Sequence, residues 1–150
     1  MNERFDLVVK NVRVVRPNRT SVDKLDVGIK DGRFARLAAE IPAAEAAKVT
    51  DAKGLLGFPG CVDAHMHVGI YQDLDKDAVS ESKAAAMGGV TTSLNYMRTG
   101  QYYLNRGGPW RDFMPEVLRL AEGNFWVDYG FHMAPIEGGH IGEMDAMWKP

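Results

Sequence analysis

The first third of the chain alternates short apolar and polar runs at the two-residue period of β-strands. The runs "FDLVV" at 5–9 and "VRVV" at 12–15 are rich in β-branched residues, and Asp31-Gly32 separates two later runs as a tight hairpin does. An Ala-rich stretch at 38–48 is interrupted by Pro42, which favours a surface loop with a short helical turn. Residues 1–57 are therefore predicted to form a β domain without a sustained helical period.

After Pro59 the pattern changes to alternating strands and helices. Strand-like runs cover 61–68, 90–97 and 125–134, and helical runs cover 77–89, 111–123 and 139–149. We expect the first helix to begin at Asp77 or Ser80 and to end at Gly88, and the second to begin at Asp112. This alternation predicts βαβ units and a parallel sheet, and hence an α/β fold.

Each of these strands is polar on one face and largely apolar on the other when its residues are counted in twos. The three predicted polar faces are Asp63, His65 and His67; Thr91, Ser93 and Asn95; and Asp128, Gly130 and His132. Helices cover both faces of an open parallel sheet, so polar faces are unexpected there. A closed barrel accounts for them better, because its inner face ends in an active site.

His65 and His67 are the candidate metal ligands of the first strand. Neutral imidazole is a good ligand for zinc, and two neighbouring buried histidines need partners. The spacing by itself leaves a metal site and two ordinary solvated histidines equally open. The remaining candidates favour other roles. Cys61 is expected to be a small buried residue, His132 a hydrogen-bonded core residue or a residue that supports a ligand, and His140 an exposed residue.

Composition narrows the classes of protein. The chain has 150 residues, of which 45% are hydrophobic and 25% charged, with a net charge of −2. These values are typical of a globular domain and argue against nucleic acid or an anionic membrane as the main partner. With a single cysteine, no apolar leader and no membrane-spanning run, the sequence predicts a cytoplasmic location.

Three motifs together resemble the amidohydrolase superfamily: "IKDGRFARL" at 29–37, "PGCVDAHMH" at 59–67 and "AAAMGGVTT" at 84–92. The second matches the Pro-Gly-x-x-Asp-x-His-x-His signature of that family. The resemblance covers essentially the whole chain and is nearest to the cyclic amidases, which include dihydropyrimidinases, hydantoinases and allantoinases.

The resemblance implies a TIM-type (β/α) barrel beside a small β-sandwich. Residues 1–57 would be the first part of the sandwich, and 58–150 the first three of eight barrel units. His65 and His67 would bind one or two divalent ions, with zinc expected. Asp63 would orient these ligands, although a structural hydrogen bond is an equal alternative. A carboxylated Lys, two further His and a catalytic Asp would follow residue 150.

Some positions depart from particular branches of the family. Gly69 stands where dihydroorotases usually carry an Arg, and the run at 94–97 lacks the metal-binding Cys of D-aminoacylases. Asn95 stands where cyclic amidases often have an Asp. Arg98 and Asn95 are predicted to bind substrate. The loop that follows contributes candidates for gripping a polar ring, namely Arg98, Tyr102, Tyr103, Asn105, Arg106 and Trp110.

The function implied is hydrolysis of a non-peptide carbon–nitrogen bond, in a cyclic amide such as a hydantoin or dihydropyrimidine, by metal-activated hydroxide. The full-length protein would be a homo-oligomer, and this chain by itself is expected to be inactive and to associate. The alternative is a non-catalytic, amidohydrolase-like scaffold for assembly, which would have no need of both histidines.

Overall fold

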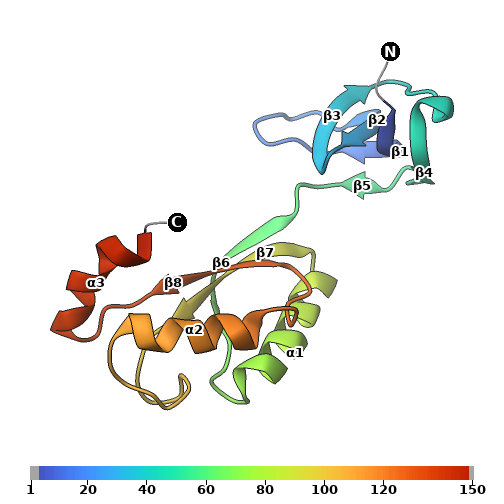
Figure 1. Ribbon diagram of the computed structural model, residues 1–150. Helices are drawn as coiled ribbons and strands as arrows, with labels where there is room; N and C mark the ends of the chain where they lie inside the picture. Colours follow the sequence, from blue (N-terminus) through green and yellow to red (C-terminus); the bar gives the residue numbers. More distant parts are fainter. Residues whose placement is uncertain (1–3, 149–150) are drawn as a thin grey trace. The chain divides into compact units, whose positions relative to one another are not determined.

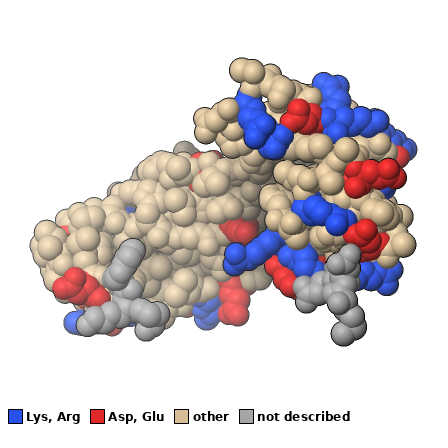
Figure 2. Space-filling model, turned by 90° about the horizontal axis from the view of Figure 1, so that it is seen from above, with Lys and Arg blue, Asp and Glu red and all other residues tan. Residues whose placement is uncertain are grey.

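The computed structural model describes residues 4–148, and the chain divides into two compact units, Met1–Pro59 and Gly60–Pro150. No helix within 4–148 has both the length and the apolar character needed to cross a bilayer. On the face drawn in Figure 2, acidic and basic side chains are interspersed, in keeping with the net charge of −2.

The first unit is the predicted β domain, here confirmed as a five-stranded sheet (Figure 1). Its elements are β1 (Phe5–Val14), β2 (Asp23–Lys30), β3 (Arg33–Ala38), the 3₁₀ turn η1 (Ala43–Glu45), β4 (Ala46–Asp51) and β5 (Leu56–Gly57). The order is β3-β2-β1-β4, with β5 also paired to β1. Asp31 and Gly32 have φ angles of 49° and 69°, so the β2–β3 hairpin turns where the sequence predicts, through left-handed residues.

A buried carboxylate organises this unit. Asp26 is only 4% exposed, and it accepts hydrogen bonds from the backbone N–H groups of Asn11 and Ile41, both at 2.9 Å. Lys10 Nζ lies 2.8 Å from the same carboxylate. Burial by itself raises the pKa of Asp26, but Lys10 and the two N–H groups outweigh it, so the pKa lies below the ordinary 3.8. A fully partnered charge thus joins β1, β2 and the segment before η1.

The second unit has the predicted alternation of strands and helices. Its elements are β6 (Cys61–His67), α1 (Leu74–Met87), β7 (Val90–Met97), α2 (Trp110–Ala121), β8 (Asp128–Met133) and α3 (Gly138–Trp148). The sheet has the order β6-β7-β8 with both pairs parallel, which confirms the parallel sheet and the mixed α/β class. Helices α1 and α2 lie on the same side of this sheet (Figure 1).

Two helix starts differ from the prediction. Helix α1 begins at Leu74 and not at Asp77 or Ser80, because Asp77 has another partner: its Oδ2 accepts the Gly69 N–H at 2.6 Å. Helix α2 begins at Trp110, directly after Pro109 and two residues before Asp112. Proline is favoured next to a helix start because its φ is already near the helical value. The predicted end of α1 at Gly88 is confirmed.

The core of the second unit lies between its sheet and its helices. Val68 and Met97, at the carboxyl ends of β6 and β7, are at most 1% exposed. They belong to one cluster with Leu74, Tyr103, Trp110, Phe113, Met114 and Val117. The helical members alternate at the three- and four-residue spacing that places side chains on one face of a helix.

The predicted polar faces of β6 and β7 are wrong in part. In β7 the buried side is Ser93, Asn95 and Met97, while Tyr96 pairs with His67 of β6 and His132 of β8. In β6 the register shifts between Asp63 and Met66. This irregularity resets the two-residue count, so Asp63 pairs with the buried Ser93 and does not share a face with His67.

Two burial predictions are also wrong. Cys61 is exposed, although it was expected to be buried. His140 is 1% exposed, although it was expected on the surface. Its ring stacks on Trp110 at 4.8 Å between centroids, Nδ1 accepts the N–H groups of Ile136 and Glu137, and Nε2 donates to the Gly108 carbonyl at 3.1 Å. These contacts account for its burial, since every ring nitrogen has a partner.

Candidate metal centre

The two predicted ligands meet at the carboxyl end of β6. The Nε2 atoms of His65 and His67 lie 3.0 Å apart, and both side chains are exposed. A zinc–nitrogen bond is about 2.0–2.1 Å long, so one ion can lie within bonding distance of both atoms. The same distance also suits a hydrogen bond between one protonated and one unprotonated Nε2. The donor pair therefore fits a divalent cation, and it supplies part of a coordination sphere.

The described part of the chain offers no third ligand grouped with this pair. Within residues 4–148 there is no cluster of three or more His, Cys, Asp or Glu that could hold a metal ion. The ring centroid of His132 lies 4.9 Å from that of His65. Its Nε2 is buried and has no hydrogen-bond partner in the described part of the chain, so this atom does not make the hydrogen bond expected of a core residue. The alternative, that His132 supports the metal ligands, stays a prediction.

Aromatic rings surround the pair. Tyr96 lies between the histidines, with its centroid 4.9 Å from that of His67 and 5.6 Å from those of His65 and His132. Partial desolvation of its imidazole, helped by the coulombic effect of His65 and His132, lowers the pKa of His67 below the ordinary 6.5. This direction favours the neutral imidazole, which is the form that binds a metal.

Tyr103 is the contact that the sequence did not single out. Its hydroxyl lies 2.7 Å from His67 Nδ1, although 36 residues separate the two. The side chain is 3% exposed, and burial, together with Tyr96, raises the pKa of its phenol above 10.0 against the opposing effect of Arg98. From the sequence, Tyr103 was predicted only as one of several loop residues that could grip a polar ring. Nothing in its spacing distinguishes it from Tyr102.

The other predicted site residues lie elsewhere. Asp63 Oδ1 accepts the backbone N–H of His65 at 3.1 Å, so its observed contact is with the backbone beside the ligand and not with an imidazole. Asn95 is fully buried, and its Nδ2 donates to Ser93 Oγ and the Gly130 carbonyl, both at 3.1 Å. This amide is enclosed within the sheet and faces away from His67. Trp110 is also buried, against His140, and is not free to grip a ring.

Arg98 is held within its own loop. Its guanidinium donates to the carbonyls of Thr99 and Gln101, both at 3.2 Å, and lies 5.0 Å from the centroid of the Tyr103 ring. The arginine is therefore connected to His67 through Tyr103. Contact between Arg98 and a substrate stays a prediction.

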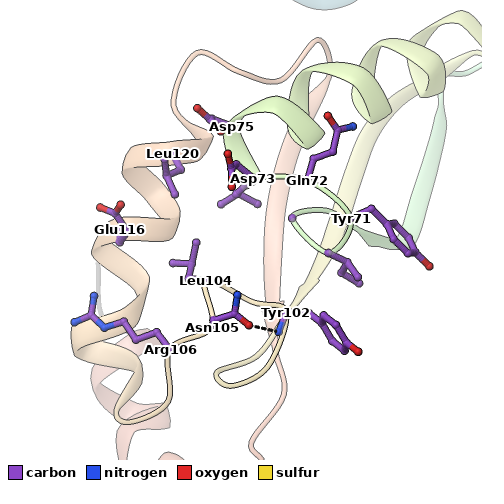
Figure 3. A pocket seen from close by; sticks show the side chains of 13 residues that line it. Tyr71, Gln72, Asp73, Asp75, Tyr102, Leu104, Asn105, Arg106, Glu116 and Leu120 are labelled. Atoms are coloured by element: carbon purple, nitrogen blue, oxygen red, sulfur yellow. Dashed lines mark hydrogen bonds between the residues drawn. The ribbon is translucent and has the colours of Figure 1, made fainter.

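A separate cavity of about 740 Å³ lies between the loops that follow β6 and β7, the start of helix α1 and helix α2 (Figure 3). Its charged lining residues are Asp73, Asp75, Arg106 and Glu116. Figure 3 also shows Asn105 Oδ1 accepting the Tyr102 N–H at 3.1 Å, a contact that shapes the loop. Neither His65 nor His67 lines this cavity, so its chemistry is separate from that of the imidazole pair.

Known proteins with similar sequences include enzymes named allantoinase, hydantoinase and adenine deaminase. An allantoinase of Bacillus licheniformis is 39% identical over 92 residues, which are 59% of this chain and 19% of the enzyme. A D-hydantoinase of Rhizobium radiobacter is 30% identical over 137 residues, which are 89% of this chain and 28% of the enzyme. The chain is thus similar to enzymes of the cyclic amidase branch of the amidohydrolase superfamily. The resemblance found in the motifs is thereby confirmed, although no family model matches the chain.

A solved structure of a hydantoinase is also similar to this chain in fold. The structure of an L-hydantoinase (dihydropyrimidinase) from Arthrobacter aurescens superimposes with a TM-score of 0.74 at 28% identity, covering 95% of this chain and 31% of the enzyme. The chain thus spans less than a third of the length of each of these relatives.

Proposed function

We propose that the protein is a metal-dependent hydrolase of non-peptide carbon–nitrogen bonds, acting on a cyclic amide such as a hydantoin or a dihydropyrimidine. The observation that carries the proposal is the Nε2 pair of His65 and His67, 3.0 Å apart at the carboxyl end of a parallel strand. In barrel enzymes this end of the strands carries the catalytic groups. The similarity to hydantoinases and allantoinases supports the choice of substrate class.

The proposal includes the finer fold assignment. Residues 58–150 would form the first three β/α units of a TIM-type barrel, and residues 1–57 part of a β-sandwich. A barrel would enclose the face that carries His65, His67 and His132. In this structure His65 and His67 are exposed to solvent. The homo-oligomer and the cytoplasmic location stay predictions.

Each side chain has a defined task in this proposal. His65 and His67 would hold a divalent cation, with zinc favoured by the nitrogen donors. When bound, such an ion lowers the pKa of water towards about 7 and polarises a carbonyl. Asp63 holds the backbone N–H of His65 and so fixes the strand next to the ligand. Arg98, which follows the end of β7, would contact the substrate, and a substrate contact of the buried Asn95 stays a prediction.

The test uses the protein expressed at its full natural length and loaded with zinc. Hydantoin, dihydrouracil and allantoin are offered in turn, and ring opening is followed by loss of ultraviolet absorbance or by chromatography. We expect turnover of at least one ring, and its loss in His67→Ala. Cys61→Ser is the matched control, because Cys61 is exposed and lies at the opposite end of β6. A folded, zinc-loaded protein that opens none of these rings would overturn the proposal and favour the scaffold alternative.

A further inference from the structure

Two nitrogens of one imidazole have different tasks when one of them binds a metal. The hydrogen bond made by the second nitrogen decides which tautomer is present and how the ring is turned. For His65 no second-nitrogen contact is seen among the described residues. For His67 that contact is the Tyr103 hydroxyl, 2.7 Å from Nδ1.

We propose that Tyr103 is a positioning residue for His67: its hydroxyl holds the imidazole with Nε2 turned towards His65, and Arg98 in turn holds Tyr103 in place. The proposal rests on the proposed function, in that it takes His67 as a metal ligand. With a cation bound, Nδ1 would keep its proton and its N–H would donate a hydrogen bond to the phenol oxygen, so that the Nε2 lone pair would be free for the cation.

The first support is the immobility of Tyr103. The side chain is 3% exposed and belongs to the core of the second unit, together with Val68 and Met97 at the ends of β6 and β7. Its ring also meets Tyr96 at 5.8 Å between centroids. A side chain packed in this way holds its hydroxyl at a fixed place relative to the end of β6, which is what a positioning group requires.

The second support is the conformation of the loop. Tyr102, Leu104 and Asn105 have φ angles of 73°, 52° and 46°, a region that residues with a Cβ rarely occupy. The loop is closed at its base by the Gly100 N–H, which donates to the Arg106 carbonyl at 2.8 Å. Strained backbone of this kind persists where the surrounding structure enforces it, and it is concentrated at functional sites. Here the left-handed residues stand on both sides of Tyr103.

The third support is the position of Arg98. Its guanidinium lies over the Tyr103 ring at 5.0 Å and is itself fixed by the carbonyls of Thr99 and Gln101. A cation on the face of an aromatic ring attracts it and restricts its movement. Contacts thus run without interruption from Arg98 through Tyr103 to His67.

The experiment compares Tyr103→Phe with Tyr102→Phe in the protein of full natural length. Both variants lose one phenol oxygen, but Tyr102 is 53% exposed and its hydroxyl makes no hydrogen bond within residues 4–148. Zinc affinity is measured by competition with a chelator. We expect Tyr103→Phe to bind zinc roughly 10- to 100-fold more weakly, the usual cost of removing a partner of a ligand. Tyr102→Phe should bind zinc as the wild type does.

A second readout does not depend on metal. Crystal structures of the metal-free wild type and of Tyr103→Phe should show His67 Nε2 facing His65 in the first and a turned or doubly placed ring in the second. If the wild type binds no zinc, the proposed function fails. The orientation of the His67 ring in the two metal-free crystal structures then tests the positioning role of Tyr103 by itself. Unchanged zinc affinity in a zinc-binding protein, or an unmoved ring in Tyr103→Phe, overturns the inference.

A second variant covers the case in which Tyr103→Phe does not fold, which thermal unfolding would reveal. Arg98→Met keeps an apolar stem over the ring but removes the cation and its two hydrogen bonds. We expect it to weaken zinc binding in the same direction and by less than Tyr103→Phe. Zinc affinity equal to that of the wild type would remove Arg98 from the proposed arrangement.

Discussion

Two buried polar groups, one in each unit, have opposite surroundings. In the first unit, the carboxylate of Asp26 accepts from two backbone N–H groups and pairs with Lys10. In the second unit, His132 Nε2 is buried and has no partner among the described residues, and its ring lies 4.9 Å from that of His65 between centroids. A fully partnered charge stabilises a fold, whereas a ring nitrogen without a partner beside a pair of imidazoles is available to a ligand. The comparison gives Asp26 a structural role and places the candidate chemistry of the second unit around its three clustered histidines.

The largest expected effect is the loss of bound metal from the second unit. Replacing His65 and His67 together with Ala, in the protein of full natural length, should remove most of its tightly bound divalent metal, because both Nε2 donors of the pair are lost. Metal content is measured by elemental analysis after removal of loosely bound ions. Cys61→Ser should keep the metal of the wild type. If the double variant retains that metal as well, these histidines are not ligands.

The next effect is a loss of stability, because His140 has a structural role in the second unit. His140→Ala leaves the N–H groups of Ile136 and Glu137 without their acceptor and removes a ring stacked on Trp110. We expect the free energy of unfolding to fall by about 3 kcal/mol. Chemical denaturation measures it, and His140→Asn, which retains an acceptor near the position of Nδ1, should lose less. Equal losses in the two variants would contradict the importance assigned to that acceptor.

The contribution of Asp26 to the stability of the first unit can be tested by changing the pH. Its pKa in the folded unit is lowered, so its contribution to stability is present above the ordinary value of 3.8 and is lost as the pH falls from there through the folded-state pKa. Asp26→Asn should cost about 2 kcal/mol near neutral pH, because it removes the charge that Lys10 and two N–H groups stabilise. The variant should also lose less stability than the wild type between pH 5 and pH 2, roughly the range in which carboxylates titrate. Parallel acid denaturation curves for the two proteins would count against this assignment.

The smallest effect concerns the backbone beside the imidazole pair. Gly69 has φ +79°, and a Cβ added there would lie 3.2 Å from Leu74 Cβ and 3.3 Å from Leu74 Cα. Gly89 has φ +93° but open space around it, so it is the matched control for conformational strain without a clash. We expect Gly69→Ala to lose about 1 kcal/mol more than Gly89→Ala in free energy of unfolding. Equal losses would mean that Leu74 yields to the added methyl group.

Local patterns by themselves determined a large part of this protein. The β-rich first unit, the hairpin at Asp31-Gly32 and the parallel strand–helix alternation depend on short-range periodicity and turn chemistry, which the sequence displays directly. The motif around His65 and His67 indicated the similarity to cyclic amidases for the same reason, since its residues are neighbours along one strand. Helix starts were less predictable, because Asp77 caps the Gly69 loop instead of its own helix.

Only the tertiary structure decided which of these residues meet. A shift of register in β6 turned Asp63 away from His67, and no periodicity in the sequence marks that shift. The sequence did not decide which face of β7 is buried, because both faces contain polar residues. In the structure the face of Asn95 is buried, where its amide donates to Ser93 Oγ and the Gly130 carbonyl. Tyr103 reaches His67 across 36 residues through a loop of left-handed backbone, and His140 is buried by partners at 108–110 and 136–137. Such contacts depend on packing between distant segments, which a pattern of neighbouring residues does not encode.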